Sequence, residues 1–122
     1  MDRKVTLIYC PYGRENPIWA ETGYIKFGQK YIYFKPKDRD SYDKFKREEV
    51  IIIDGWREDI ETQVEQFKQK QREYYKKKEQ YKRELEIELN RTFNHIIEQK
   101  LNEWEKQNPC PKFQLNTPTF PF

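Results

Sequence analysis

Residues 56–107 read WREDIETQVEQFKQKQREYYKKKEQYKRELEIELNRTFNHIIEQKLNEWEKQ, and this stretch decides the fold. Between Gly55 and Pro109 the chain has neither glycine nor proline, and nearly every residue is a strong helix former. An apolar residue recurs every three or four positions. One helix over this range would be roughly 78 Å long at about 1.5 Å per residue. The sequence therefore predicts a single long amphipathic helix whose apolar stripe needs a partner.

The first half of this helix carries a seam with the 4-3 spacing of a coiled coil. Its members are Ile60, Val64, Phe67, Gln71, Tyr74, Lys78, Tyr81 and Leu85. Polar Gln71 and Lys78 interrupt the seam in its middle. We therefore expect a loose or partner-completed contact and not a tight zipper of identical chains.

The second half of the helix is the stronger binding element. Its apolar residues from Leu85 to Trp104 fill an arc of roughly 160° on a helical wheel of about 100° per residue. An arc of that width suits burial between two neighbours. The residues predicted to contact a protein partner are Leu89, Phe93, Ile97, Leu101 and Trp104.

Positive charge is concentrated within the helix. Between Lys68 and Arg83, eight basic residues stand against two glutamates, for a local net charge of +6. A solvated charged face is the simplest interpretation, and contact with RNA, an acidic protein or anionic lipid is the alternative. Lys76 and Lys77 are the candidate nucleic-acid contacts in this block.

Residues 108–122, NPCPKFQLNTPTFPF, form a proline-rich tail. Its four prolines disfavour a helix and favour an extended conformation. We expect the tail to dock on a partner, with packing against its own domain as the alternative. The predicted anchors are Phe113, Leu115, Phe120 and Phe122.

The region before the helix, residues 1–55, predicts a small antiparallel sheet of three or four strands or an open barrel. The strands are expected at Lys4–Cys10, Trp19–Phe27, Lys30–Lys35 and Glu49–Ile53, which are rich in β-branched and aromatic residues. The fold class is therefore α+β, with a sheet domain, the helix of residues 56–107 and the tail.

The dipeptide Gly28-Gln29 predicts a two-residue type II′ hairpin in which Phe27 faces Lys30. Alternation then separates two faces of the sheet. The apolar face carries Ile25, Phe27, Ile32 and Phe34. The other face carries Tyr24, Lys26, Tyr31, Tyr33 and Lys35.

Three tyrosines and two lysines on one face form a surface on which single-stranded nucleic acid can stack its bases while cations track the phosphates. Two alternatives stay open. Cross-strand tyrosine pairs also stabilise sheets, and the start of the long helix could cover this face.

Cys10 and Cys110 are the only cysteines, and their separation of a hundred residues is no metal-ligand spacing. Two reduced thiols are expected, with a disulfide or a cross-link to a partner as the alternatives. The segment Val5–Gly13, VTLIYCPYG, resembles the strand and Cys-Pro-Tyr opening of glutaredoxins, which implies a redox thiol. Gly13 stands where that family has its resolving cysteine, and Pro17 would interrupt the following helix, so the expected role of Cys10 is structural.

Composition narrows the function classes. The net charge of +3 is too small to imply a polyanion partner by itself, and no apolar run is long enough to span a membrane. The single histidine, His95, falls opposite the apolar arc, and phosphate-binding glycine motifs are missing.

We therefore expect no enzymatic activity, no cofactor and no bound metal. The leading hypothesis is an intracellular accessory or scaffolding subunit, cytoplasmic or in an organelle matrix, that binds a larger protein assembly. Homo-oligomers are possible. The alternative hypothesis is a small β module that binds RNA or single-stranded nucleic acid and carries a basic helical extension.

Overall fold

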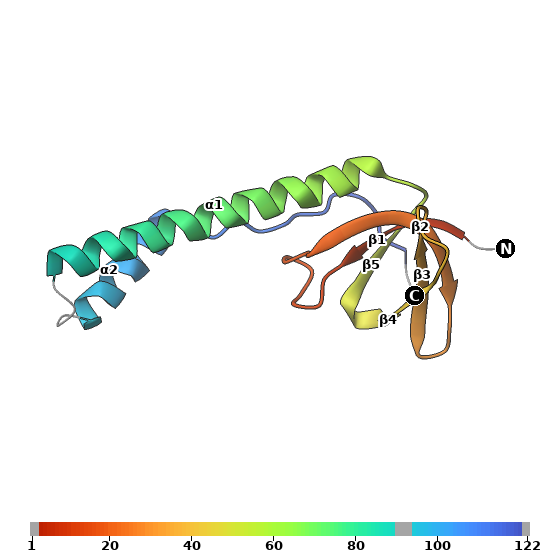
Figure 1. Cartoon of the computed structure of the whole chain (residues 1–122), viewed down its shortest axis with the longest axis horizontal. Coiled ribbons are helices and arrows are strands. Elements are labelled where there is room, and N and C mark those ends of the chain that lie inside the picture. The colour runs from red at the N-terminus through yellow and green to blue at the C-terminus, as the bar shows by residue number, and fades with distance from the viewer. Residues whose placement is uncertain (1–2, 90–93, 121–122) are drawn as a thin grey trace. The chain divides into compact units, whose positions relative to one another are not determined.

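The computed structural model describes residues 3–89 and 94–120 (Figure 1). The fold is α+β, as predicted, with one five-stranded antiparallel open sheet and two helices. The chain divides into two compact units, and each is described by itself. The sheet unit comprises Met1–Lys68 and Lys112–Phe122, and the helical unit comprises Gln69–Pro111.

The sheet contains five strands where three or four were predicted. They are β1 (Arg3–Tyr9), β2 (Trp19–Phe27), β3 (Tyr31–Pro36), β4 (Asp43–Lys46) and β5 (Val50–Asp54), in the order β4-β3-β2-β1-β5. The missed strand is β4, whose sequence DKFK has one apolar residue among three charged ones. A short 3₁₀ turn, Arg47–Glu49, leads from β4 into β5.

The β2–β3 hairpin corrects the predicted register by two residues. Phe27 pairs with Ile32 and not with Lys30. The Gly28 N–H donates to the Tyr31 carbonyl at 2.9 Å, so the two loop residues are Gln29 and Lys30. A side chain at position 28 would approach that carbonyl to 2.9 Å, so glycine is needed there for close approach. A shift of two leaves every side chain on its predicted face, because the side-chain period of a strand is two.

The inner face of the curved sheet holds one hydrophobic core. Tyr9 on β1 contacts Phe45 on β4, with ring centroids 5.5 Å apart, although two strands separate β1 from β4. This contact shows how strongly the sheet curves. The buried members of the core are Val5, Leu7, Ile25, Ile32, Phe34, Val50 and Ile52.

The outer face carries a second core at the β1–β5 side of the sheet. Helix α1 (Glu58–Leu89) begins in the sheet unit, and its first turns place three apolar side chains on this face. Ile60 and Val64 are fully buried, and burial of such a side chain stabilises a fold by about 1.5–3 kcal/mol. The members of this core are Ile8, Cys10, Ile51, Ile53, Ile60, Val64, Phe67 and Phe113.

The predicted helix of residues 56–107 is divided into two. Its helical character is roughly right, but α1 ends at Leu89 and α2 spans Asn94–Gln107. In the helical unit, Trp104 on α2 contacts Tyr74 and Tyr81 on α1, with ring centroids 5.4 and 6.0 Å apart. Lys78 on α1 also pairs with Glu105 on α2. The two helices therefore form an antiparallel pair.

Candidate nucleic-acid interface

The predicted tyrosines and lysines gather on the outer face of the sheet in three cross-strand rows. Lys4, Tyr24 and Lys35 form the first row across β1, β2 and β3. The second runs Lys26–Tyr33–Lys44 across β2, β3 and β4, and the third pairs Tyr31 with Lys46. We name this surface the Lys–Tyr face. Its residues are Lys4, Tyr24, Lys26, Tyr31, Tyr33, Lys35, Lys44 and Lys46.

Alternation of lysine and tyrosine brings ammonium groups over aromatic rings. The Nζ of Lys44 lies 3.9 Å from the ring centroid of Tyr31, and that of Lys35 lies 5.0 Å from Tyr24. Lys26 lies 4.4 Å from the ring of Tyr42, which flanks the face. The rows themselves contain no carboxylate. The result is a positive surface with aromatic rings set into it.

The rings of this face differ in exposure. Tyr33 is 38% exposed, whereas Tyr24 and Tyr31 are half-buried. Tyr24 also contacts Trp56, with ring centroids 5.6 Å apart, and Trp56 is itself 38% exposed. Tyr33 is therefore the tyrosine of the face most available for stacking.

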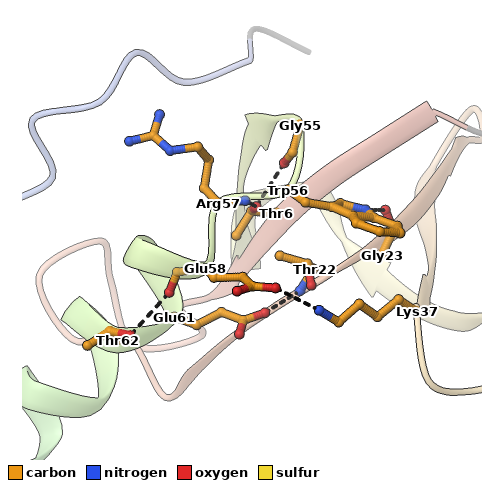
Figure 2. A network of polar contacts seen from close by, with 10 residues as sticks. All are labelled: Thr6, Thr22, Gly23, Lys37, Gly55, Trp56, Arg57, Glu58, Glu61 and Thr62. Atoms are coloured by element: carbon orange, nitrogen blue, oxygen red, sulfur yellow. Dashed lines mark hydrogen bonds and ion pairs between the residues drawn. The ribbon is translucent and has the colours of Figure 1, made fainter.

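The start of α1 borders the Lys–Tyr face and is fixed there by polar contacts (Figure 2). The Thr6 hydroxyl donates to the Gly55 carbonyl at 2.9 Å and accepts from the Arg57 N–H at 2.7 Å. Trp56 Nε1–H donates to the Gly23 carbonyl at 2.9 Å. One buried threonine of β1 and one tryptophan thus attach the helix start to the sheet.

Two carboxylates of the first helical turns complete this border (Figure 2). Glu61 accepts a hydrogen bond from the Thr22 N–H at 2.8 Å, and Glu58 pairs with Lys37 at 3.1 Å. The hydrogen bond from Lys37 to Glu58 raises the pKa of Lys37, so the amine stays charged. The Glu58 carboxylate thereby offsets part of the charge of Lys37.

The structure bears on one alternative for this face, the cover by the start of the long helix, and nucleic-acid binding stays a prediction. The helix start covers the end around Ile8, Ile51 and Ile53, as one alternative held. The structure brings together all five predicted sheet residues, Tyr24, Lys26, Tyr31, Tyr33 and Lys35, at the other end. Sequence reasoning missed Lys4, Tyr42, Lys44, Lys46 and Trp56, and the alternating lysines of KFK at positions 44–46 were the available signal.

Lys76 and Lys77 lie on α1 in the helical unit, where both are exposed. They are the remaining two residues of the predicted nucleic-acid set. They belong to a different unit from the Lys–Tyr face, which lies wholly in the sheet unit.

The described residues of the distal helix that were predicted to contact a partner are buried or half-buried. Ile97 is 4% exposed, and Leu89, Leu101 and Trp104 are half-buried. Trp104 contacts Tyr74 and Tyr81 of α1, and contact of this stripe with another protein stays a prediction. Phe93 lies outside the described residues.

The predicted tail anchors follow the alternative of packing on their own domain. Phe113 is 7% exposed and contacts Phe67, with ring centroids 5.7 Å apart. Leu115 packs against the same core. The Phe120 N–H donates to the Ile52 carbonyl at 2.7 Å, and its ring stacks on Phe27. Phe122 lies outside the described residues.

The environments of the two cysteines argue against a redox site. Burial raises the pKa of the Cys10 thiol to about 11, the opposite of a reactive redox thiol, while Cys110 is exposed and also unpaired. Among residues 3–89 and 94–120, no three histidine, cysteine or acidic side chains gather as a metal site. Neither helix, as far as it is described, is apolar enough over sufficient length to cross a membrane.

Comparison of the chain with protein-family models, curated proteins and solved structures found no match.

Proposed function

We propose that this chain is a non-catalytic module that binds single-stranded nucleic acid on the Lys–Tyr face. The supporting observation is the set of cross-strand rows in which lysine and tyrosine alternate over four strands. Such proteins combine a positive track for the backbone with rings on which successive bases stack. Since every base has an aromatic face, this mode tolerates many sequences.

The interaction energies favour replacement of a lysine above a tyrosine ring by a stacked nucleic-acid base. A lysine over an exposed ring contributes about 0.5–1 kcal/mol, and a stacked base contributes about 1–3 kcal/mol. A base that displaces Lys44 from Tyr31, or Lys35 from Tyr24, therefore gains more than the protein loses. The displaced ammonium group remains beside the strand and can pair with a phosphate.

Replacement of Tyr33 tests the stacking step. Fluorescence anisotropy with labelled RNA and DNA oligomers of about 12 nucleotides, within the usual site sizes, measures the affinity. We expect Tyr33→Ala to weaken binding by about 1–3 kcal/mol and Tyr33→Phe, which keeps the ring, to stay close to wild type. Tyr75→Ala is the matched control, because Tyr75 is 51% exposed but lies on α1 in the helical unit. Equal affinity of Tyr33→Ala and wild type would contradict the proposal.

We also propose, as a second candidate, the role of accessory subunit in an intracellular protein assembly. Ile87 on α1 supports it, because this large apolar side chain is 84% exposed. Sedimentation velocity on the full chain and on Ile87→Ser tests it. Self-association that Ile87→Ser abolishes would support a contact at this position, and identical monomeric behaviour of both proteins would argue against a homo-oligomeric contact there.

A further inference from the structure

A partly open cavity of about 320 Å³ lies in the sheet unit. The 3₁₀ turn, strand β5, the loop after β1 and the tail all contribute to its wall. None of its lining residues belongs to the Lys–Tyr face, so the cavity is a separate feature.

Two arginines give this cavity a positive wall. Arg14 comes from the loop between β1 and β2, and Arg47 opens the 3₁₀ turn. Within residues 3–89 and 94–120, neither arginine forms an ion pair with a carboxylate, and Glu48 is the single acidic residue of the lining. The cavity therefore carries more positive than negative charge.

Arg47 is held in place by the protein without being neutralised. Its Nη2 donates to the Gly28 carbonyl, while its buried Nε has no acceptor among the described residues. This guanidinium is thus fixed in orientation and lacks a full set of acceptors. The charge of Arg14 also reaches the cavity interior, where it opposes the increase that burial causes in the pKa of Cys10.

The rest of the lining combines apolar and polar residues. Val50 and Ile52 on β5 are 7% and 0% exposed, and Phe120 of the tail closes one side. The neighbouring Thr119 adds a hydroxyl group to the lining. A ligand that matches this wall needs both an anionic end and an apolar body.

We propose that the cavity binds a small organic oxyanion, a carboxylate or phosphate attached to an aromatic or other apolar group. Arg14 and Arg47 hold the oxyanion, because the planar guanidinium matches the geometry of carboxylate and phosphate oxygens. Phe120, which is half-buried, contacts the apolar group, and the buried Val50 and Ile52 lie behind it in the wall. The tail is thereby part of a binding site, in addition to its role in the core.

Titrations of the full ¹⁵N-labelled chain with four probes test this proposal by NMR. The probes are benzoate, phenyl phosphate, neutral benzamide and inorganic phosphate. We expect benzoate or phenyl phosphate to shift the amide signals of Arg47, Val50 and Phe120. Benzamide, which has the ring without the charge, and inorganic phosphate, which has the charge without the ring, should bind about tenfold more weakly or less. The tighter of the two organic anions identifies the oxyanion as carboxylate or phosphate.

Variants locate the site. Arg14→Gln should weaken binding of the preferred probe about tenfold, with an unchanged fold because Arg14 is exposed and forms no ion pair with another described residue. Arg47→Lys keeps the positive charge but loses the planar guanidinium and its paired N–H donors. This variant should therefore also weaken binding. Arg72→Gln, on the exposed side of α1, is the matched control and should bind like wild type.

Three results would overturn the proposal: no shifts with either organic anion, equal binding of benzamide, or unchanged binding by Arg14→Gln. Arg14→Gln should leave nucleic-acid binding as it is, since Arg14 lies outside the Lys–Tyr face. Failure of this site and failure of the proposed function are therefore distinguishable.

Discussion

Thr6 joins β1 to the first turn of α1 through a single hydroxyl group. The side chain is fully buried, and it satisfies both the Gly55 carbonyl and the Arg57 N–H. Thr6→Val keeps the shape but leaves two backbone groups without this partner. We expect a loss of about 1–3 kcal/mol in the free energy of unfolding, measured by urea denaturation.

Thr62→Val is the matched control for this change. The Thr62 hydroxyl is exposed and donates to the Glu58 carbonyl of its own helix (Figure 2). Its removal should alter the free energy of unfolding by no more than about 0.5 kcal/mol. Equal effects of the two substitutions would show that Thr6 does not anchor the helix.

The two cysteines should differ in reactivity. Cys10 is 3% exposed and burial raises its pKa to about 11 from the usual 9.0, whereas Cys110 is exposed. Peptide mapping after iodoacetamide treatment of the native protein at mildly alkaline pH should find Cys110 alkylated and Cys10 protected. Alkylation of Cys10 as fast as that of Cys110 would contradict this environment.

The same shift predicts a pH dependence of stability. The folded state favours the neutral thiol of Cys10, while the unfolded state ionises near pH 9.0. The contribution of this group is therefore complete below that value and declines as the pH rises toward about 11. Urea denaturation of wild type and of Cys10→Ala over this range measures it, and parallel pH profiles would argue against the shift.

At the scale of elements, the strand faces could be predicted and the register could not. Alternation assigned Ile25 and Tyr24 to opposite faces whichever even register the hairpin adopts. The register itself depends on which two residues form the loop, and Gly28 was compatible with more than one choice. Strand β4 lacks the apolar run that marks a strand, and its pairing with β3 is a tertiary effect.

The helical seam was predicted at the right positions, but the sequence did not identify what covers it. Ile60, Val64 and Phe67 pack on the sheet, and Tyr74 and Tyr81 contact Trp104 of α2. Periodicity shows which face of a helix is buried, but it does not identify what covers that face. The presence of two helices within residues 56–107, and not one, was not predictable either, because this range contains no glycine or proline.

The packing of α2 on α1 predicts different stability effects for two isoleucine substitutions, one of which is the matched control. Ile97 on α2 is 4% exposed, while Ile87 on α1 is 84% exposed. Ile97→Ala should cost about 2–5 kcal/mol in the stability of the helical unit, and Ile87→Ala should cost far less. Hydrogen exchange of the α2 amides measures the local stability. Similar exchange rates in the two variants would mean that α2 does not pack on α1.

At the scale of the whole molecule, the tail completes the core of the sheet unit. Phe113 is 7% exposed and its N–H donates to the Glu15 carbonyl at 3.2 Å. Phe113→Ala should therefore lower the free energy of unfolding by about 3–5 kcal/mol, whereas its exposed neighbour Gln114 should tolerate alanine. Thermal melts of both variants measure the difference. If the tail contacted only a partner protein, both variants would melt at the wild-type temperature.

The Lys–Tyr face could be predicted from the sequence only within its central hairpin. Tyr24, Lys26, Tyr31, Tyr33 and Lys35 share a face by alternation alone. Lys4 and Lys44 join them through the β1–β2 and β3–β4 pairings. Those pairings join segments whose order in the sheet no local pattern specifies. The cavity lined by Arg14 and Arg47 was likewise hidden, because three separate segments of the chain, the tail among them, build it.

The dependence of oligonucleotide affinity on salt tests the nucleic-acid function most directly. Each lysine that neutralises a phosphate contributes about 0.7 to the slope of log affinity against log salt for a single strand. The double variant Lys35→Gln/Lys44→Gln should therefore lower the slope by about 1.4. The control Lys76→Gln/Lys77→Gln, in the helical unit, should leave it unchanged. An unchanged slope in the sheet variant, or a decrease only in the helix variant, would contradict binding on the Lys–Tyr face.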